Sequence, residues 1–175
     1  MFGLHGGNRS LPIGKTGGYE DGRVESVTQL IKLFKKASSL RGKNREFAEN
    51  DIEGLLVGIN AFPENKGVIL LADNNACIRD YSIMHQITRP VHIIPCGGIT
   101  LNPQFLNLAQ YTGGSVFWLD QRINDWPTLC NGDIFNLGDD KYRFLKTKQR
   151  FELLNEDGKH KDFCDVYTNK LKKKR

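Results

Sequence analysis

Two segments in the first third of the chain carry apolar residues at helical spacing. Within VESVTQLIKLFKKA, residues 24–37, apolar positions recur every three or four residues on one side of a helix, and they are Val24, Val27, Leu30, Ile31 and Phe34. Residues 51–62 keep the same period, with Asn50 at the capping position before them and Pro63 after them. The pattern predicts two helices joined by the polar segment SSLRGKNREF.

Three short apolar runs follow, and their hydrophobicity is continuous rather than alternating. They are GVILLADN, VHIIPCG and GSVFWL. Continuous runs are typical of strands buried on both faces, as in parallel sheets. Between them, residues 76–87 return to helical spacing before Pro90, and a further helical pattern opens at Asn102 and Pro103, a capping residue followed by proline at the first helical position. Strand and helix therefore alternate, which predicts right-handed parallel crossovers.

These elements predict an α/β fold, an open, mostly parallel, doubly wound (Rossmann-like) sheet with helices on both faces. After Leu119 the pattern changes to a connector, INDWPTLCNG, and then to a C-terminal antiparallel hairpin of two or three strands at the edge of the sheet. No core signal follows Asn155. We expect one domain, residues 1–155, made of a Gly-rich loop segment (1–23), an α/β core (24–119) and the connector with its hairpin (120–155), followed by a basic tail (156–175).

Length and charge agree with a single domain that does not bind nucleic acid. The chain has 175 residues, 39% of them hydrophobic, which is enough for one core. The net charge of +5 equals the contribution of five basic residues at the very end, and removing them from the 25 Lys and Arg leaves 20 basic against 20 acidic residues. We therefore expect no nucleic-acid partner. No transmembrane segment and no secretory signal is predicted; the compartment is unknown, with cytoplasmic as the default.

The four cysteines are Cys77, Cys96, Cys130 and Cys164, which are widely spaced, without a C-x-x-C pair or a histidine at metal-ligand spacing. We interpret them as free thiols and predict no zinc site. Residues 9–18, RSLPIGKTGG, contain the end of a phosphate-loop pattern, but Arg9 stands where its first glycine should be, and no strand precedes or helix follows it. A nucleotide loop is therefore not predicted there.

Ligands of open α/β sheets bind outside the carboxyl ends of the strands. The residues at those ends are Asp73 and Asn74 after the first strand and Gly97 and Gly98 after the second. Asp73 has two interpretations. It caps a helix that begins near Ala76, or it is an oxygen ligand for a hard cation such as Mg²⁺.

The runs KGVILLADN, RPVHIIPCGG and LNPQFLNLAQYTGGSVF, in this order, resemble the second half of a von Willebrand factor A (vWA) domain over about residues 24–119. The resemblance implies a metal-ion-dependent adhesion site, in which Mg²⁺ or Mn²⁺ bridges the domain to an acidic group of a protein or peptide ligand. In this site the family's aspartate falls on Asp73. The second loop falls on Asn50 and Asp51, with Thr16 as a weaker candidate.

The D-x-S-x-S motif of that family, which supplies its main metal ligands, occurs nowhere in the sequence. The resemblance therefore implies an incomplete or degenerate site, in a fragment or a chain with a misplaced start. Metal binding is expected to be weak or absent. The strand GVILLAD would then lack a neighbour and expose an apolar edge prone to pairing.

Two functions stay open at this point. The first is a vWA-like binding module, which is not an enzyme. The alternative is a doubly wound enzyme acting on a phosphorylated or nucleotide substrate through its Gly-rich loops and Asp73. No Ser/His/Asp or Cys/His arrangement supports the enzyme.

Overall fold

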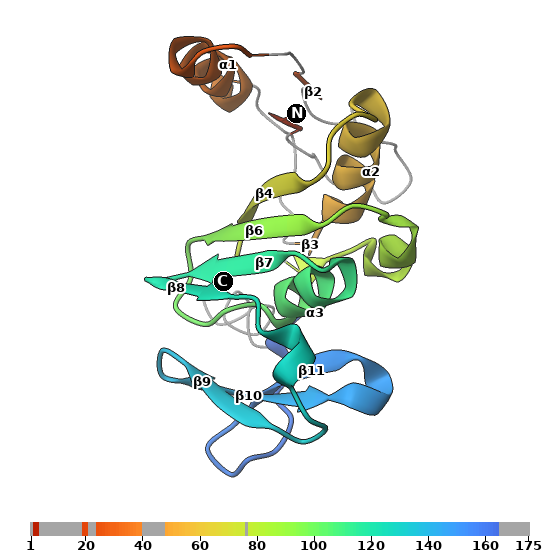
Figure 1. Ribbon diagram of the computed structural model, residues 1–175. Helices are drawn as coiled ribbons and strands as arrows, with labels where there is room; N and C mark the ends of the chain where they lie inside the picture. The colour runs from red at the N-terminus through yellow and green to blue at the C-terminus, as the bar shows by residue number, and fades with distance from the viewer. Residues whose placement is uncertain (1, 4–18, 21–23, 40–47, 76, 165–175) are drawn as a thin grey trace.

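The structure, a computed structural model, describes residues 2–3, 19–20, 24–39, 48–75 and 77–164 (Figure 1). Its main sheet has four strands, β4 (Val68–Asp73), β6 (Val91–Cys96), β7 (Ser115–Trp118) and β8 (Gln121–Ile123), in the order β4-β6-β7-β8. The first three are parallel, and β8 returns antiparallel to β7. The α/β class and the three predicted strands are confirmed, whereas β8 lies in a segment taken from the sequence as a connector.

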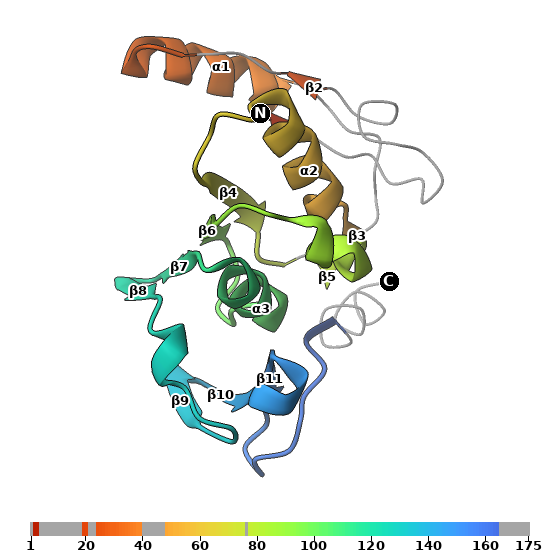
Figure 2. The same cartoon turned by 45° about the vertical axis from the view of Figure 1, so that its right-hand side comes forward.

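Two helices cover one face of this sheet. They are α2 (Asp51–Ala61) and α3 (Pro103–Thr112), which lie on the same side of the strands in Figure 2. Under them, Val91, Ile93 and Val116 are fully buried. The chain leaves α3 through Gly114, where an added Cβ would lie 1.8 Å from the Val91 carbonyl oxygen, so only glycine fits this close approach.

The opposite face of the sheet is apolar and exposed. Ile69 is 67%, Leu71 45%, Ile94 37% and Phe117 40% accessible. The strand register places Leu71 beside Ile94, and the pairing of Ile93 with Val116 places Phe117 beside Ile94 on the other side. We call these four side chains the open face. In the described part of the chain, helices thus cover one face of the sheet, and coverage of both faces stays a prediction.

A second sheet packs below α3. Its strands β9 (Ile134–Leu137), β10 (Asp140–Leu145) and β11 (Arg150–Leu154) are antiparallel, in the order β11-β10-β9. The Tyr142 hydroxyl donates to the Leu101 carbonyl oxygen (2.7 Å), and the Phe151 N–H donates to Asn107 Oδ1 (2.5 Å). The predicted antiparallel strands are confirmed, but their placement at the edge of the main sheet is wrong, because aromatic side chains on their inner face attach them to α3 as a separate layer.

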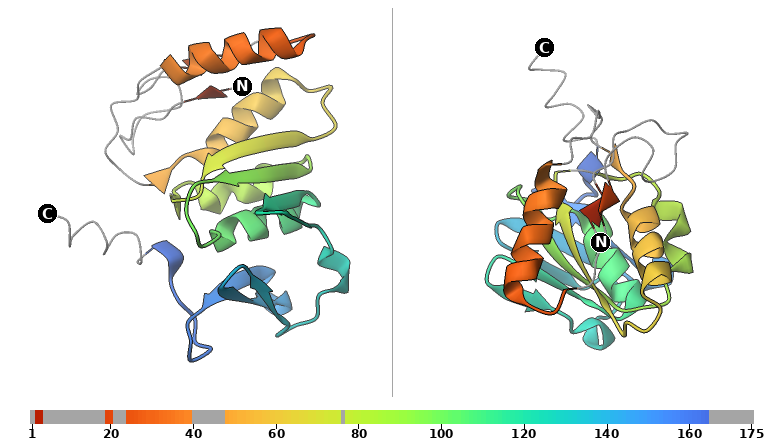
Figure 3. Two further views of the ribbon diagram at one scale, coloured as in Figure 1. Left: turned by 90° about the vertical axis from the view of Figure 1, so that its left-hand side faces the viewer. Right: turned by 90° about the horizontal axis from the view of Figure 1, so that it is seen from above.

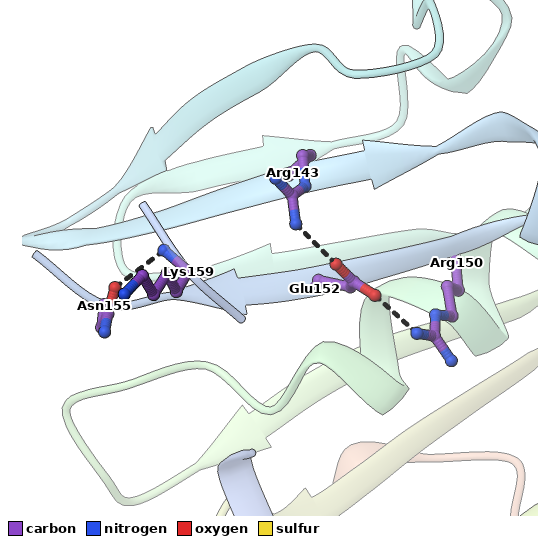
Figure 4. Close-up of polar contacts among 5 residues, drawn as sticks. All are labelled: Arg143, Arg150, Glu152, Asn155 and Lys159. Atoms are coloured by element: carbon purple, nitrogen blue, oxygen red, sulfur yellow. Dashed lines mark hydrogen bonds and ion pairs between the residues drawn. The ribbon is translucent and has the colours of Figure 1, made fainter. Parts of the chain in front are cut away.

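The outer face of this second sheet carries an ion-pair group. Arg143 and Arg150 both donate to Glu152, one to each carboxylate oxygen, at 2.9 and 2.5 Å (Figure 4). Burial alone would raise the pKa of Glu152, but the two arginines outweigh it and hold the pKa below its usual value. The turn that follows β11 is closed by the Lys159 N–H, which donates to Asn155 Oδ1 (2.8 Å; Figure 4).

The first predicted helix is confirmed as α1 (Val27–Ser39). It lies beyond β4 in Figures 1 and 3 and contacts the short strands β1 (Phe2–Gly3) and β2 (Tyr19–Glu20). None of its side chains from Val27 to Lys36 is buried.

The remaining elements are short. β3 (Ala48–Glu49) pairs in parallel with β5 (Cys77–Ile78), and three 3₁₀ turns occur: η1 (Tyr81–Gln86), η2 (Trp126–Thr128) and η3 (Lys146–Lys148). The helix predicted for residues 76–87 is therefore wrong. Its apolar spacing instead buries Ile78 from a strand and Ile87 from the end of a 3₁₀ turn.

Two expectations for the cysteines and the C-terminal end are corrected. Cys77 and Cys164 form a disulfide, so only Cys96 and Cys130 are free thiols, and both are exposed. Phe163 is buried in the core, although no core signal was expected after Asn155. The bond brings together residues 87 positions apart, a relation that spacing along the sequence does not reveal. The basic residues 170–175 lie outside the described residues.

Candidate functional site

The loops after β4 and β6 meet at the carboxyl end of the sheet, as the sequence predicts. Asp73 ends β4 and pairs in register with Cys96, which ends β6. Both side chains are exposed. Gly97 and Gly98 follow with φ angles of 77° and 72°, in the left-handed region that favours glycine. This corner of the sheet is the candidate site.

Asn74 fastens the two loops together and is itself fully buried. Its Nδ2 donates to the carbonyl oxygens of Gly97 (3.2 Å) and Thr100 (2.7 Å), and its Oδ1 accepts the Asn102 N–H (2.9 Å). Its backbone N–H donates to the Cys96 carbonyl oxygen. Asn74 therefore belongs to the predicted loop, but every described contact of its side chain is with the protein, and it fixes the loop from within.

Asp73 closes a turn within its own loop. Its Oδ1 accepts both the backbone N–H (2.9 Å) and the side-chain Nδ2 (3.0 Å) of Asn75. The interpretation of Asp73 as a helix cap is wrong, because the strand β5 follows instead of a helix. Oδ2 takes no part in these two bonds, and the Asp73 side chain is exposed.

Gly97 approaches this turn closely. An added Cβ at Gly97 would lie 3.0 Å from Asn75 Nδ2 and 3.8 Å from Asp73 Oδ1. A side chain at this position would therefore crowd the Asp73 turn as well as strain the backbone. The glycine keeps the carboxylate accessible from the side of β6.

The second predicted loop, Asn50 and Asp51, begins α2. Asn50 stands at the N-cap position, but its side chain makes no capping bond; its Nδ2 donates to Glu53 (3.0 Å) and its Oδ1 is buried without a hydrogen-bond partner. The cap comes from Asp80, whose two oxygens accept the N–H groups of Ile52 (3.2 Å) and Glu53 (2.6 Å). The role assigned to Asn50 as cap is thus corrected.

Asp80 is the residue that sequence reasoning missed. It lies 28 positions from Ile52, so no local pattern marks the contact. Burial raises the pKa of Asp80 above its usual value and the charge of Glu53 adds to this, while the two backbone N–H groups act in the opposite direction. A helix N-terminus favours a carboxylate at this place, so Asp80 is explained by the cap alone.

The described donors do not assemble a metal shell. In residues 48–75 and 77–164, as in the shorter described segments, no three His, Cys, Asp or Glu side chains lie together in a way that could hold an ion. Asp73 bonds within its own turn, and Asn50 bonds to Glu53 at the start of α2, so the two predicted parts of the site belong to separate hydrogen-bond networks. Mg²⁺ takes near-octahedral oxygen ligation, which these residues do not supply by themselves. Thr16 and the loop of residues 9–18 lie outside the described residues.

A groove of about 250 Å³ lies elsewhere, between β8, η2 and β9. Arg122, at its rim, donates from Nε to Ser115 Oγ (3.2 Å) and stands 5.8 Å from the ring centre of Phe117. None of the residues predicted from the sequence as a site lines this groove.

Comparison of the chain with models of known families, with curated proteins and with solved structures returned no match. Within the described residues, every helix is too short or too polar to cross a bilayer.

Proposed function

We propose that this chain is a binding module of the vWA kind that contacts a protein or peptide ligand at the carboxyl end of its parallel sheet. The observation that carries the proposal is the Asp73 corner, where an exposed carboxylate stands on two loops that the buried Asn74 fastens together. A fixed loop presents its groups without an ordering cost on binding, which favours recognition.

The finer fold assignment, a doubly wound sheet with helices on both faces, belongs to the same proposal. It is supported by the parallel order β4-β6-β7 and by the continuous apolar character of the strands.

Direct recognition through Asp73 needs a donor on the ligand, and we propose a basic or amide-rich peptide segment for this role. Recognition through Mg²⁺ or Mn²⁺ needs oxygens beyond those described, so metal binding by this chain is proposed to be weak or absent. The partner is proposed to be protein rather than nucleic acid, because the charge of the chain outside its last six residues is balanced.

The test selects binders from a random peptide library with the full chain, in parallel with Asp73→Ala and Asp139→Ala. Asp139 is an exposed acid in the turn between β9 and β10, and its substitution controls for loss of one negative charge. We expect peptides that bind the unmodified chain and Asp139→Ala but lose binding to Asp73→Ala. Selections without any Asp73-dependent peptide would contradict the proposed site.

Calorimetric titration of the same three proteins with Mg²⁺ and with Mn²⁺ separates the metal question from the ligand question. We expect weak or no heat of binding in each. Tight metal binding by the unmodified chain that disappears in Asp73→Ala would contradict this and show that the chain has a complete metal-ion-dependent adhesion site.

A further inference from the structure

The side chains of the open face of the main sheet are apolar, like those of a protein core. Ile69, Leu71, Ile94 and Phe117 occupy three adjacent strands and form one continuous patch, because the register sets Leu71, Ile94 and Phe117 side by side. Parallel sheets occur almost only with both faces covered. An apolar patch of neighbouring side chains, in contrast to single exposed apolar residues, marks an interaction surface.

The two edge strands of the sheet differ in how well they are protected against pairing with another chain. β8 consists of Gln121, Arg122 and Ile123, and such a short and charged strand is a typical protected edge. β4 has six residues, VILLAD, with neither lysine, proline nor a bulge. Its composition is that of a strand from the middle of a sheet, so the surface that needs a partner is centred on β4 and β6.

The helix α1 has no buried side chain between Val27 and Lys36. In α1, Val27 is 72% and Ile31 48% accessible, and these two residues lie one turn apart on the same side. Helices of this length are marginal in water without tertiary packing, and an amphipathic helix gains its stability by burying its apolar side. α1 is therefore the second surface of the molecule that lacks a cover.

The two surfaces match in size. A helix of 13 residues is about 20 Å long, and a strand of six residues is also about 20 Å long. A helix about 10 Å wide spans two strands that are about 4.8 Å apart, so one α1 covers β4 and β6. In the structure α1 lies beyond β4 and contacts β1 and β2 (Figure 3), while Val27 and Ile31 stay exposed.

We propose that the chain forms a dimer in which α1 of each copy packs on the open face of the other. The exchange is reciprocal, so it closes after two copies. Each copy then has helices on both faces of its sheet, with α2 and α3 on one face and the partner's α1 on the other. The proposal does not depend on the binding role of Asp73.

The first test is sedimentation velocity of the full chain over a wide concentration range. We expect a monomer–dimer equilibrium, and we expect Leu71→Glu and Ile31→Glu each to raise the dissociation constant by about tenfold or more, because each places a charge in the buried contact. Ile134→Glu is the matched control, since Ile134 is an exposed isoleucine on β9, away from both surfaces. Circular dichroism melts establish that each variant is folded.

The second test identifies which copy supplies the helix. Cys96 is a free, exposed thiol on the same side of β6 as Ile94, two residues along the strand, so it reports on the open face without substitution. One differently tagged copy carries Cys96 with Cys130→Ser, and the other carries Ile31→Cys with Cys96→Ser and Cys130→Ser. A short bifunctional thiol reagent should join the two copies.

Three results would overturn the proposal. The first is a chain that stays monomeric at all concentrations, as it would if another protein covers the open face. The second is a chain carrying both Ile31→Cys and Cys96 that links only within itself, which would show that α1 covers its own sheet. The third is a dimer that is unaffected by Leu71→Glu and Ile31→Glu alike, which would place the contact elsewhere.

Discussion

The outer faces of the two sheets of this protein differ: one carries charged side chains and the other carries apolar side chains. The antiparallel sheet carries Arg143 and Arg150, whose side chains are 32% and 44% accessible, and both pair with Glu152, which is itself 7% accessible. The parallel sheet presents Leu71, Ile94 and Phe117. Both sheets bury their inner faces against α3, so the difference between them lies in the side chains of their outer faces. The antiparallel sheet exposes arginine side chains to water, whereas the parallel sheet exposes apolar side chains, which the proposed dimer would cover.

The sequence records this difference in its periodicity. β10 alternates between outward and inward side chains, with Lys141 and Arg143 outward and Tyr142 and Phe144 buried. β4 also alternates between more and less exposed positions, but, apart from Asp73 at its end, both sets are apolar. An antiparallel sheet can face water on one side, whereas a parallel sheet is normally buried on two. The pattern of apolar and polar residues along a strand therefore indicates whether a face of the sheet is suited to water or to a protein surface, even when the segment that covers it is unknown.

The largest expected effect compares two neighbouring residues of β6. Ile93 is fully buried under the helices, and Ile94 points to the open face. We expect Ile93→Ala to lower the free energy of unfolding by about 2–5 kcal/mol, because it leaves a cavity in the core. Ile94→Ala should cost less than about 1 kcal/mol in dilute solution, since it removes a partly exposed side chain.

Urea denaturation of the two variants at low protein concentration measures both values. Equal losses of stability would contradict the distinction between the two faces. If the loss for Ile94→Ala grows with protein concentration, the open face is buried by association.

The next effect concerns the segment that follows the antiparallel sheet. The Lys161 N–H donates to the Leu153 carbonyl oxygen, Phe163 is buried, and Cys164 is bonded to Cys77 on β5. We expect Cys164→Ser to lower the free energy of unfolding by about 2–4 kcal/mol, as removal of a disulfide that closes a long loop does.

Alkylation in denaturant, followed by mass measurement, checks the pairing itself. Two labels are expected without reductant, at Cys96 and Cys130, and four labels after reduction. Four labels without reductant would show that the pair is not formed, and Cys130→Ser should leave the stability unchanged as the matched control.

How far the sequence predicts the fold depends on the range of the interactions. Helix α3 was predicted with its cap, because Asn102 and Pro103 act on their own neighbours, and the Asn102 side chain indeed accepts the Gln104 N–H (2.9 Å). The helix predicted for residues 76–87 failed, because Ile78 and Ile87 are buried by contacts from distant segments.

Prediction of the candidate site is limited in the same way, by contacts between residues far apart in the sequence. Asp73 and the two glycines were predicted from their place at strand ends, but Asp80 and the disulfide were not. Their partners lie 28 and 87 residues away, and a single sequence carries no record of such pairs.

A smaller effect, dependent on pH, is expected for the outer face of the antiparallel sheet. Because the arginines hold the pKa of Glu152 below its unfolded value, the ionised form stabilises the fold. This contribution is present above the unfolded pKa and is lost as pH falls through the folded pKa. Glu152→Gln should therefore cost about 1.5–3 kcal/mol at neutral pH, through the loss of charged hydrogen bonds.

The same variant should also flatten the decline of stability on the acid side. Unfolding measured at a series of pH values checks this, with Glu156→Gln as control because Glu156 is an exposed acid near the end of the same sheet. An acid decline that is equally steep in Glu152→Gln would assign it to other groups.

The smallest expected effect lies on the open face itself. Leu71→Thr replaces an exposed leucine of β4 by a polar residue with a good preference for strands, so the free energy of unfolding in dilute solution should change by no more than about 0.5 kcal/mol. The variant should nevertheless bind less of a fluorescent hydrophobic dye than the unmodified chain, because Leu71 belongs to the apolar patch and stands beside Ile94. Ile134→Thr removes an exposed isoleucine from the antiparallel sheet, where the next strand places Arg143 opposite it, and should leave dye binding unchanged. If the two variants lower dye binding equally, the dye reports scattered apolar residues and the outer faces of the two sheets do not differ as their side chains indicate. A loss of stability in Leu71→Thr as large as that in Ile93→Ala would instead mean that β4 is already covered within a single chain.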